Sequence, residues 1–300
     1  LSQRGRGSIA ERNAKLILMV GVLGVSASAI LVRFSQAPSG VTAAYRLGWT
    51  VLLLLPVVLL RCRAELRRVT ARDLVLCGAS GVLLALHFLT WFESLKRTSV
   101  ASSTVLVSTE VIFTALGFAL FLHGKIPRLG VWAILLAFGG SALLALSGGG
   151  GAGELSGNLL ALAAASAAAV YTLIGRIQRG HLSTTVYTFL TYLACFLTLL
   201  LGTAAAGTPL TGYGGREWLI GLALAVLCTL LGHSLFSWCL KYLSPSYVSA
   251  AKLCEPVFSS LAAIPLFGEV PGPLQLAGGA AVLGAVLLYT WAEREKTPAG

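Results

Sequence analysis

LKRTSVASSTVLVSTEVIF, residues 95–113, returns in diverged form 145 positions later as LKYLSPSYVSAAKLCEPVF, residues 240–258. Five positions are identical between the two stretches, and one of them aligns Glu110 with Glu255. Each stretch passes from a polar beginning into apolar sequence, and further apolar segments lie before and after both. Weak internal similarity of this kind is typical of membrane proteins built from two related halves. The sequence therefore predicts that the chain consists of two similar halves.

The composition of the chain indicates a membrane protein. Of its 300 residues 56% are hydrophobic and only 11% are charged, and the mean hydropathy is +0.85. Soluble domains carry about 25% charged residues. The basic residues behind the net charge of +11 are scattered over short connections, which does not indicate nucleic-acid binding. The six cysteines are dispersed as well, so neither a metal site nor another cofactor is expected.

Ten apolar segments, each about long enough to cross the ~30 Å hydrocarbon layer of a bilayer, follow one another along the chain. They are residues 15–34, 40–61, 73–95, 98–121, 128–147, 158–178, 183–206, 216–241, 245–267 and 271–291. Five segments fall in a first half, 15–147, and five in a second half, 158–291, with a glycine-rich linker at 148–157. Short tails, 1–14 and 292–300, complete the expected organisation.

Lysine and arginine are unequally divided between the two sides of these segments. Sixteen of the 22 lie in or beside the tails and connections on the side of the N-terminus, and three, Lys96, Arg97 and Arg216, lie on the other side. Because positive residues favour the cytoplasmic side, both termini are expected to be inside. Because five is an odd number of crossings, the second half enters the membrane from the opposite side to the first half. The predicted fold is therefore all-α and integral to the membrane, with ten transmembrane helices in two inverted five-helix repeats.

With these features the chain resembles the drug/metabolite transporter superfamily, and within it the EamA-type permeases. The most specific piece is LCEPVFSSLAAIPLFGEV, residues 253–270, and Arg46 is weaker support. The first half departs from the pattern, because TEVIF lacks the proline and no glutamate matches Glu269. The resemblance covers nearly the whole chain. It implies a multi-pass protein of the cell membrane that exports small metabolites such as amino acids, including aromatic amino acids.

Lys252, Glu255 and Pro256 in the ninth segment are candidates for a functional role. Charged side chains inside a span are costly, so they face a cavity or a partner. Lys252 and Glu255 are three positions apart on one helix face, and Pro256 leaves a carbonyl without its helical donor. We expect Lys252 to line a substrate cavity, and Glu255, Pro256 and the repeat-related Glu110 to act in coupling or gating. A structural role, in which Glu255 ties helices together and Pro256 gives a fixed bend, stays open.

Other polar and aromatic residues within the spans are candidates for the cavity lining. They are Arg46, His87, Trp91, Tyr171, His233 and Trp238. The planar guanidinium of Arg46 suits a substrate carboxylate, although an ion pair or extension to the membrane surface is an equally good interpretation. His87 and Trp91 share a helix face, and a buried histidine can carry a proton, but helix–helix hydrogen bonding is the simpler role for each histidine. Arg33, nearer a segment end, is expected to extend to the membrane surface.

The sequence thus favours a secondary transporter that exports small metabolites by alternating access. Its expected partners are a small-molecule substrate, preferably a neutral amino acid, and the lipid bilayer, with the chain as a monomer or homodimer. No G-x-x-x-x-G-K-[ST] motif occurs, so ATP is not expected to drive it directly, and protons stay open as a coupling ion. An enzyme is not expected, because the four histidines are dispersed and Asp73 is the only aspartate. A drug or cation exporter of the same fold, a channel and a non-transporting scaffold stay open.

Overall fold

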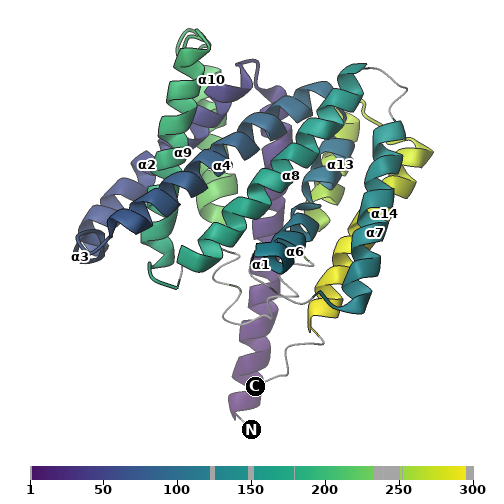
Figure 1. Cartoon of the computed structure of the whole chain (residues 1–300), viewed down its shortest axis with the longest axis horizontal. Helices are drawn as coiled ribbons and strands as arrows, with labels where there is room; N and C mark the ends of the chain where they lie inside the picture. The colour runs from purple at the N-terminus through teal and green to yellow at the C-terminus, as the bar shows by residue number, and fades with distance from the viewer. Residues whose placement is uncertain are drawn as a thin grey trace.

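The computed structural model describes residues 2–121, 126–147, 152–178, 180–232, 235, 239, 251 and 253–294 (Figure 1). Every regular element in this part of the chain is a helix. The helices are α1 (Ser2–Phe34), α2 (Ser39–Arg61), α3 (Arg63–Leu66), α4 (Ala71–Arg97), α5 (Val100–Val107), α6 (Glu110–Phe121), α7 (Arg128–Ser147), α8 (Ala152–Gln178), α9 (Thr184–Ala205), α10 (Gly215–Ala223), the π-helix η1 (Leu224–Gly232), α13 (Cys254–Phe267) and α14 (Pro273–Arg294).

The predicted all-helical membrane protein is confirmed in its coarse form. Within the described ranges, eight helical stretches are long and apolar enough to cross a membrane, and two of them, Val100–Gly117 and Gly215–Gly232, each run over two of the helices named above. Two shorter apolar helices, Arg128–Leu144 and Cys254–Phe267, fall where the fifth and ninth segments were expected. Ten crossings, the inverted repeat and the orientation of the termini stay predictions.

Side-chain caps explain several helix boundaries. Thr70 accepts a hydrogen bond from the backbone N–H of Asp73, and the Asp73 carboxylate accepts one from the backbone N–H of Thr70, so α4 begins with a capping box. The hydroxyl of Ser99 accepts from Ser102 N–H at the start of α5, and Ser183 does the same at the start of α9. Because these caps satisfy N–H groups that no helical carbonyl can reach, the helices begin at these residues.

The expected fourth span is not one continuous helix. Its helix stops at Val107 and starts again at Glu110. The hydroxyl of Ser108 donates to the Thr104 carbonyl, and that of Thr109 donates to the Leu106 carbonyl. Serine and threonine hydroxyls that bond to nearby carbonyls compete with the regular helical pattern. The span is therefore broken immediately before Glu110.

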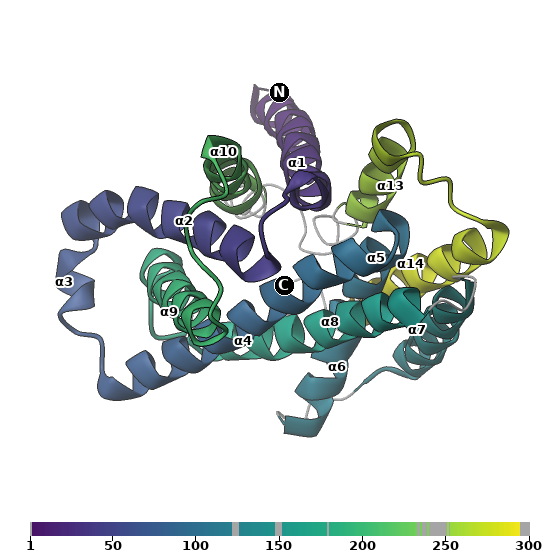
Figure 2. The same cartoon turned by 90° about the horizontal axis from the view of Figure 1, so that it is seen from above.

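The two halves of the chain are interleaved. The first half comprises α1 to α7 and the second comprises α8 to α14. The pair α4 and α8, the pair α2 and α9, and the pair α7 and α14 pack side by side, and α5 packs on α13 (Figure 2). By position in the two halves, α1 corresponds to α8, and α4 corresponds to η1. The contact between α1 and η1 therefore matches the contact between α8 and α4. Such matched contacts are what a twofold relation between the halves produces.

Candidate functional site

Arg46 of α2 is buried where four helices meet. Only 4% of the residue is exposed, so it does not extend to the surface. Its Nε donates to the hydroxyl of Thr229 on η1 at 2.9 Å, and its Nη1 donates to the hydroxyl of Ser28 on α1 at 3.1 Å. The guanidinium carbon lies 4.5 Å from the centroid of the Phe88 ring on α4, which is a cation–π distance. Helices of both halves therefore hold this one cation.

The hydrogen-bond partners of Arg46 are neutral. Among the described residues, no carboxylate forms an ion pair with it. Glu255 acts on it electrostatically but is not one of its hydrogen-bond partners. A buried cation that lacks a paired anion is unfavourable in a membrane interior. The guanidinium therefore keeps the capacity to attract a further anion.

His87 and Trp91 lie on α4, the helix whose Phe88 contacts this cation. The ring centroids of His87 and Trp91 are 5.8 Å apart, and the charge of Arg46 acts electrostatically on His87. Nδ1 of His87 lies 3.0 Å from the carbonyl oxygen of Ala164 on α8, which is a hydrogen bond between helices. Trp91 is 6% exposed, and its buried Nε1 has no hydrogen-bond partner among the residues that the structure describes. Because an unpaired buried N–H costs about 1–3 kcal/mol, such groups are rare and call for an explanation.

The two repeat-related glutamates occupy matching places. Glu110 is the first residue of α6, and Glu255 is the second residue of α13. The positive end of a helix dipole stabilises a carboxylate in the first turn. Glu110 accepts a hydrogen bond from the Thr172 hydroxyl of α8 at 2.7 Å, and it acts electrostatically on His87. Pro256 is buried in the same first turn of α13 as Glu255, where a helix tolerates proline.

The structure thus places His87 and Trp91 on the helix that contacts Arg46, while Glu255 acts electrostatically on Arg46 and Glu110 on His87. Tyr171 of α8 is half-buried and packs against the largest apolar cluster, which contains Trp91. The other three candidates, His233, Trp238 and Lys252, lie outside the described residues. The carbonyl that Pro256 was expected to free belongs to Lys252 and lies outside them too.

Sequence reasoning missed the π-helical form of η1. Thr229, which binds Arg46, donates at the same time to the carbonyl of Leu224 five residues earlier, as the wide turn of a π-helix allows. π-Helical turns are rare and frequent at functional sites. The leucine-rich sequence of this segment has no feature that distinguishes it from an ordinary helix.

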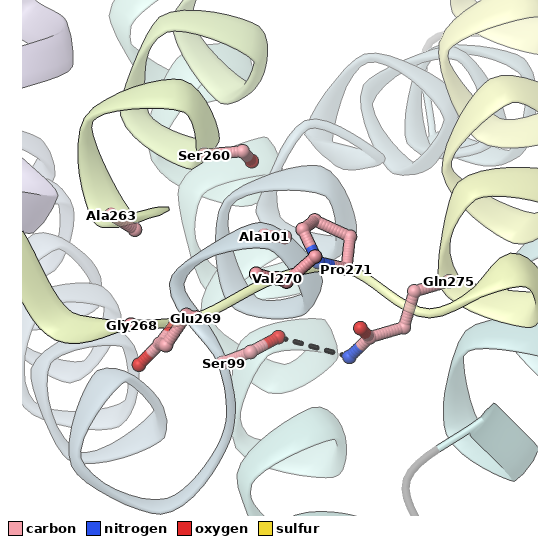
Figure 3. Close-up of a pocket in the computed structure, with 9 residues that line it drawn as sticks. All are labelled: Ser99, Ala101, Ser260, Ala263, Gly268, Glu269, Val270, Pro271 and Gln275. Atoms are coloured by element: carbon pink, nitrogen blue, oxygen red, sulfur yellow. Dashed lines mark hydrogen bonds between the residues drawn. The ribbon is translucent and has the colours of Figure 1, made fainter. Parts of the chain in front are cut away.

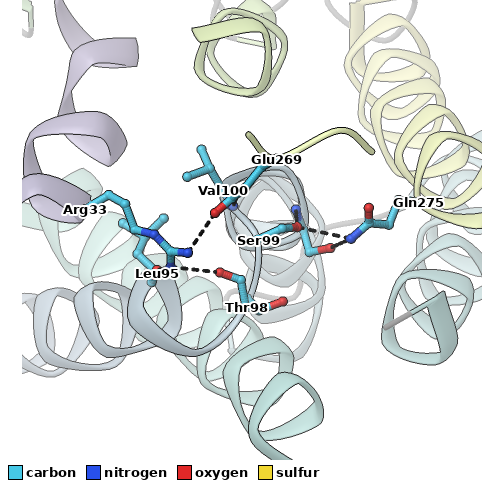
Figure 4. A network of polar contacts seen from close by, with 8 residues as sticks. Arg33, Leu95, Thr98, Ser99, Val100, Glu269 and Gln275 are labelled. Atoms are coloured by element: carbon cyan, nitrogen blue, oxygen red, sulfur yellow. Dashed lines mark hydrogen bonds and ion pairs between the residues drawn. The ribbon is translucent and has the colours of Figure 1, made fainter. Parts of the chain in front are cut away.

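A second polar cluster lies where α1 and α13 end, and it contains Arg33, whose expected extension to the membrane surface stays a prediction. Arg33 pairs with Glu269 at 2.7 Å (Figure 4). The other carboxylate oxygen of Glu269 accepts from the backbone N–H of Val100 at 2.7 Å. Arg33 also donates to the backbone carbonyls of Leu95 and Thr98. We call the Arg33–Glu269 pair the latch, since it joins α1, the α4–α5 connection and the α13–α14 connection.

A cavity of about 270 Å³ adjoins the latch (Figure 3). Its lining residues are Ser99, Ala101, Ser260, Ala263, Gly268, Glu269, Val270, Pro271 and Gln275. The side-chain amide of Gln275 on α14 donates to the hydroxyls of Ser99 and Ser102 at 3.1 Å each. The lining therefore offers hydroxyls, an amide and one carboxylate.

The family of the chain follows from a comparison of its two halves with known families. The model of the EamA-like transporter family matches twice, over residues 13–146 and over residues 155–291. The chain belongs to the EamA-like transporter family. With its apolar helices, this EamA-like protein is a multi-pass membrane protein. The two matches coincide with the two halves that the internal similarity predicts.

Proteins similar to this chain include named exporters. The pseudopaline exporter CntI of Pseudomonas aeruginosa is 24% identical over 207 residues, which are 69% of this chain and 72% of the relative. The probable terminal-alkyne amino-acid exporter of Streptantibioticus cattleyicolor is 28% identical over 233 residues, which are 74% and 75% of the two chains. One solved crystal structure matches with a TM-score of 0.60 at 18% identity and covers 94% of this chain and 98% of the other. That likeness supports the fold alone.

Proposed function

We propose that this EamA-like protein is a secondary transporter that exports neutral amino acids, aromatic ones included, across the cytoplasmic membrane. The observation that carries the proposal is Arg46, a buried guanidinium with neutral hydrogen-bond partners. A guanidinium binds a carboxylate with two parallel hydrogen bonds, and a membrane interior strengthens this attraction. One similar protein is named as an amino-acid exporter, which supports the same class of substrate.

The other candidate residues also have roles in this proposal. The unpaired Nε1–H of Trp91 donates to the same carboxylate, while Glu255 and Glu110 attract the ammonium group or exchange a proton with it. His87 and Tyr171 line the cavity, together with His233, Trp238 and Lys252 from outside the described residues. Because Arg46 is buried here, solute reaches it only when the helices move apart.

Alternating access in this proposal uses the irregular helices. The chain crosses the membrane ten times with both termini inside, and the halves rock about the central site. The break at Ser108–Thr109 and the π-helix η1 flank that site, since one precedes Glu110 and the other holds Arg46 through Thr229. Short interruptions of this kind let a helix bend without the loss of a whole turn.

Counterflow in proteoliposomes tests this function. Vesicles are preloaded with unlabelled amino acids, and entry of labelled phenylalanine, labelled threonine and the drug cation tetraphenylphosphonium is followed. Saturable uptake of an amino acid that depends on preloading is the expected result. Uptake of the cation alone would make the protein a drug exporter, and conductance without saturable exchange would make it a channel.

Replacing Trp91 with phenylalanine is expected to weaken phenylalanine binding about tenfold, because one hydrogen bond to a carboxylate is lost. The thermal stability of the ligand-free protein is expected to stay the same or rise, since the unpaired buried N–H disappears. Binding is measured by isothermal titration in detergent, and stability by thermal unfolding. Trp132→Phe on α7, where Trp132 is 67% exposed, is the matched control and is expected to bind like the wild type. Wild-type affinity in Trp91→Phe would exclude a role of Nε1 in solute binding.

A further inference from the structure

We propose that Glu269 is a binding residue at the exit of the transport path for the ammonium group of the solute, and that Arg33 occupies it while the outer end is closed. The inference rests on the proposed function, which places the N-terminus inside. With that orientation, the end of α1 that carries Arg33 faces the outside. The latch therefore lies on the side where an exporter releases its solute.

The latch joins parts that must separate when the outer end opens. Arg33 belongs to the first half of the chain and Glu269 to the second, 236 positions later. Glu269 also accepts a hydrogen bond from the first backbone N–H of α5, and Arg33 donates to two carbonyls at the end of α4 (Figure 4). Since alternating access moves one half against the other, opening this end breaks the pair between the halves.

Opening without a replacement for Arg33 would leave Glu269 in an unfavourable state. Its side chain is 17% exposed while the pair is intact, and opening would take away its paired cation. An unpaired, partly buried carboxylate is destabilised, whereas one that exchanges one cation for another is not. An ammonium group meets this requirement, and amino acids carry one.

The cavity beside Glu269 has the size and the chemistry for this exchange. A volume of about 270 Å³ corresponds to roughly nine waters at liquid density, which is enough for the amino end of a small solute. The hydroxyls of Ser99 and Ser260 and the amide of Gln275 line it with Glu269 (Figure 3). Ammonium groups donate three hydrogen bonds, and these oxygens accept them.

Only one half of the sequence has a glutamate at the position of Glu269. The loop of the first half that corresponds to the turn after α13 contains no glutamate to match Glu269. A residue needed only for helix packing would be expected in both halves, because their helices pack in matching pairs. A residue that assists release of the solute is needed on only one side of the membrane. This agrees with the presence of the glutamate in the second half alone.

The test measures how the outer cavity opens in response to solute. Ser260→Cys places a thiol in the cavity wall, and a membrane-impermeant thiol reagent is applied from outside to oriented vesicles. Mass spectrometry of the peptide 259–267, released by cleavage after Phe258 and Phe267, reports the labelling rate of position 260 separately from those of the six native cysteines. The solutes are phenylalanine, 3-phenylpropionate, which lacks the ammonium group, and phenethylamine, which lacks the carboxylate.

We expect phenylalanine to raise the labelling rate about tenfold and 3-phenylpropionate to leave it nearly unchanged. Glu269→Gln is expected to raise the rate by a similar factor without solute and to abolish the response to phenylalanine. Glu93→Gln is the matched control, because Glu93 pairs with Arg97 at 2.8 Å at the same end of α4 but does not join the two halves. This control is expected to behave like the wild type.

If Glu269→Gln fails to fold, a variant in which the charges of Arg33 and Glu269 are exchanged provides the test. The double variant Arg33→Glu with Glu269→Arg restores a pair but puts a cation at the exit. We expect slow labelling that no longer responds to phenylalanine. Equal responses to phenylalanine and 3-phenylpropionate, in a protein that exchanges phenylalanine in counterflow, would overturn the exit site and leave the proposed function intact. Absence of amino-acid counterflow in the wild type would instead overturn the proposed function, and the exit site with it.

Discussion

Arg46→Gln is expected to lower the counterflow of labelled phenylalanine by about a hundredfold or more, because the substrate carboxylate loses its charged, bidentate partner. The ligand-free protein is expected to remain folded, since glutamine still offers a donor to Thr229 and the variant no longer buries a cation. The initial rate of counterflow at several internal concentrations measures the effect. Elution as a single species in size-exclusion chromatography and thermal unfolding in detergent verify the fold.

Two variants make this result specific to the buried guanidinium. Arg216→Gln removes an exposed arginine that donates to the Phe34 carbonyl, and it is expected to transport like the wild type. Arg46→Lys keeps the charge but loses the planar fork, so an intermediate rate is expected. If Arg46→Gln folds and exchanges phenylalanine at the wild-type rate, the guanidinium is structural and the solute binds elsewhere.

Gly81→Ala is expected to cause the largest loss of stability from a single added methyl group. Gly81 lies where α4 crosses α9, and a Cβ there would be 2.5 Å from the Cβ of Ala194. It would also be 2.7 Å from the backbone nitrogen of Cys195 and from the carbonyl oxygen of Thr191. Because backbone atoms cannot move aside as a flexible side chain does, the helices must separate, which costs about 1–3 kcal/mol or more. Thermal unfolding in detergent measures the loss.

Gly78→Ala, three positions earlier on the same helix, is the control for this prediction. A Cβ at Gly78 would meet no atom within 4 Å. Alanine is favoured over glycine in a helix by about 1 kcal/mol, so this variant is expected to be as stable as the wild type or more stable. Equal unfolding temperatures for the two variants would contradict the close crossing of α4 and α9.

Most helix boundaries could be predicted because local sequence determines them. The segment length follows from the thickness of the bilayer, and Thr70 with Asp73 forms a capping signal that is visible in the sequence. The break before Glu110 was harder to foresee, because Ser108 and Thr109 bond within their own helix and such residues also occur in unbroken helices.

The candidate site could be predicted only in part, because sequence shows which residues share a helix face but not how the faces of separate helices are turned. His87 and Trp91 are neighbours on one helix, and their stacking follows from that spacing. The approach of Arg46 to Phe88 and Thr229 depends on how α2, α4 and η1 pack. The latch was missed for the same reason. Glu269 is visible in its motif, but nothing in the sequence pairs it with Arg33.

Competition binding on the purified wild-type protein tests directly whether Arg46 anchors a carboxylate. Labelled phenylalanine is displaced by 3-phenylpropionate, which retains the carboxylate, or by phenethylamine, which retains only the ammonium group. If the buried guanidinium holds the solute, 3-phenylpropionate displaces the label at a concentration lower by about tenfold or more. If phenethylamine is the equal or better competitor, the solute is not anchored by its carboxylate and the assignment of Arg46 is wrong.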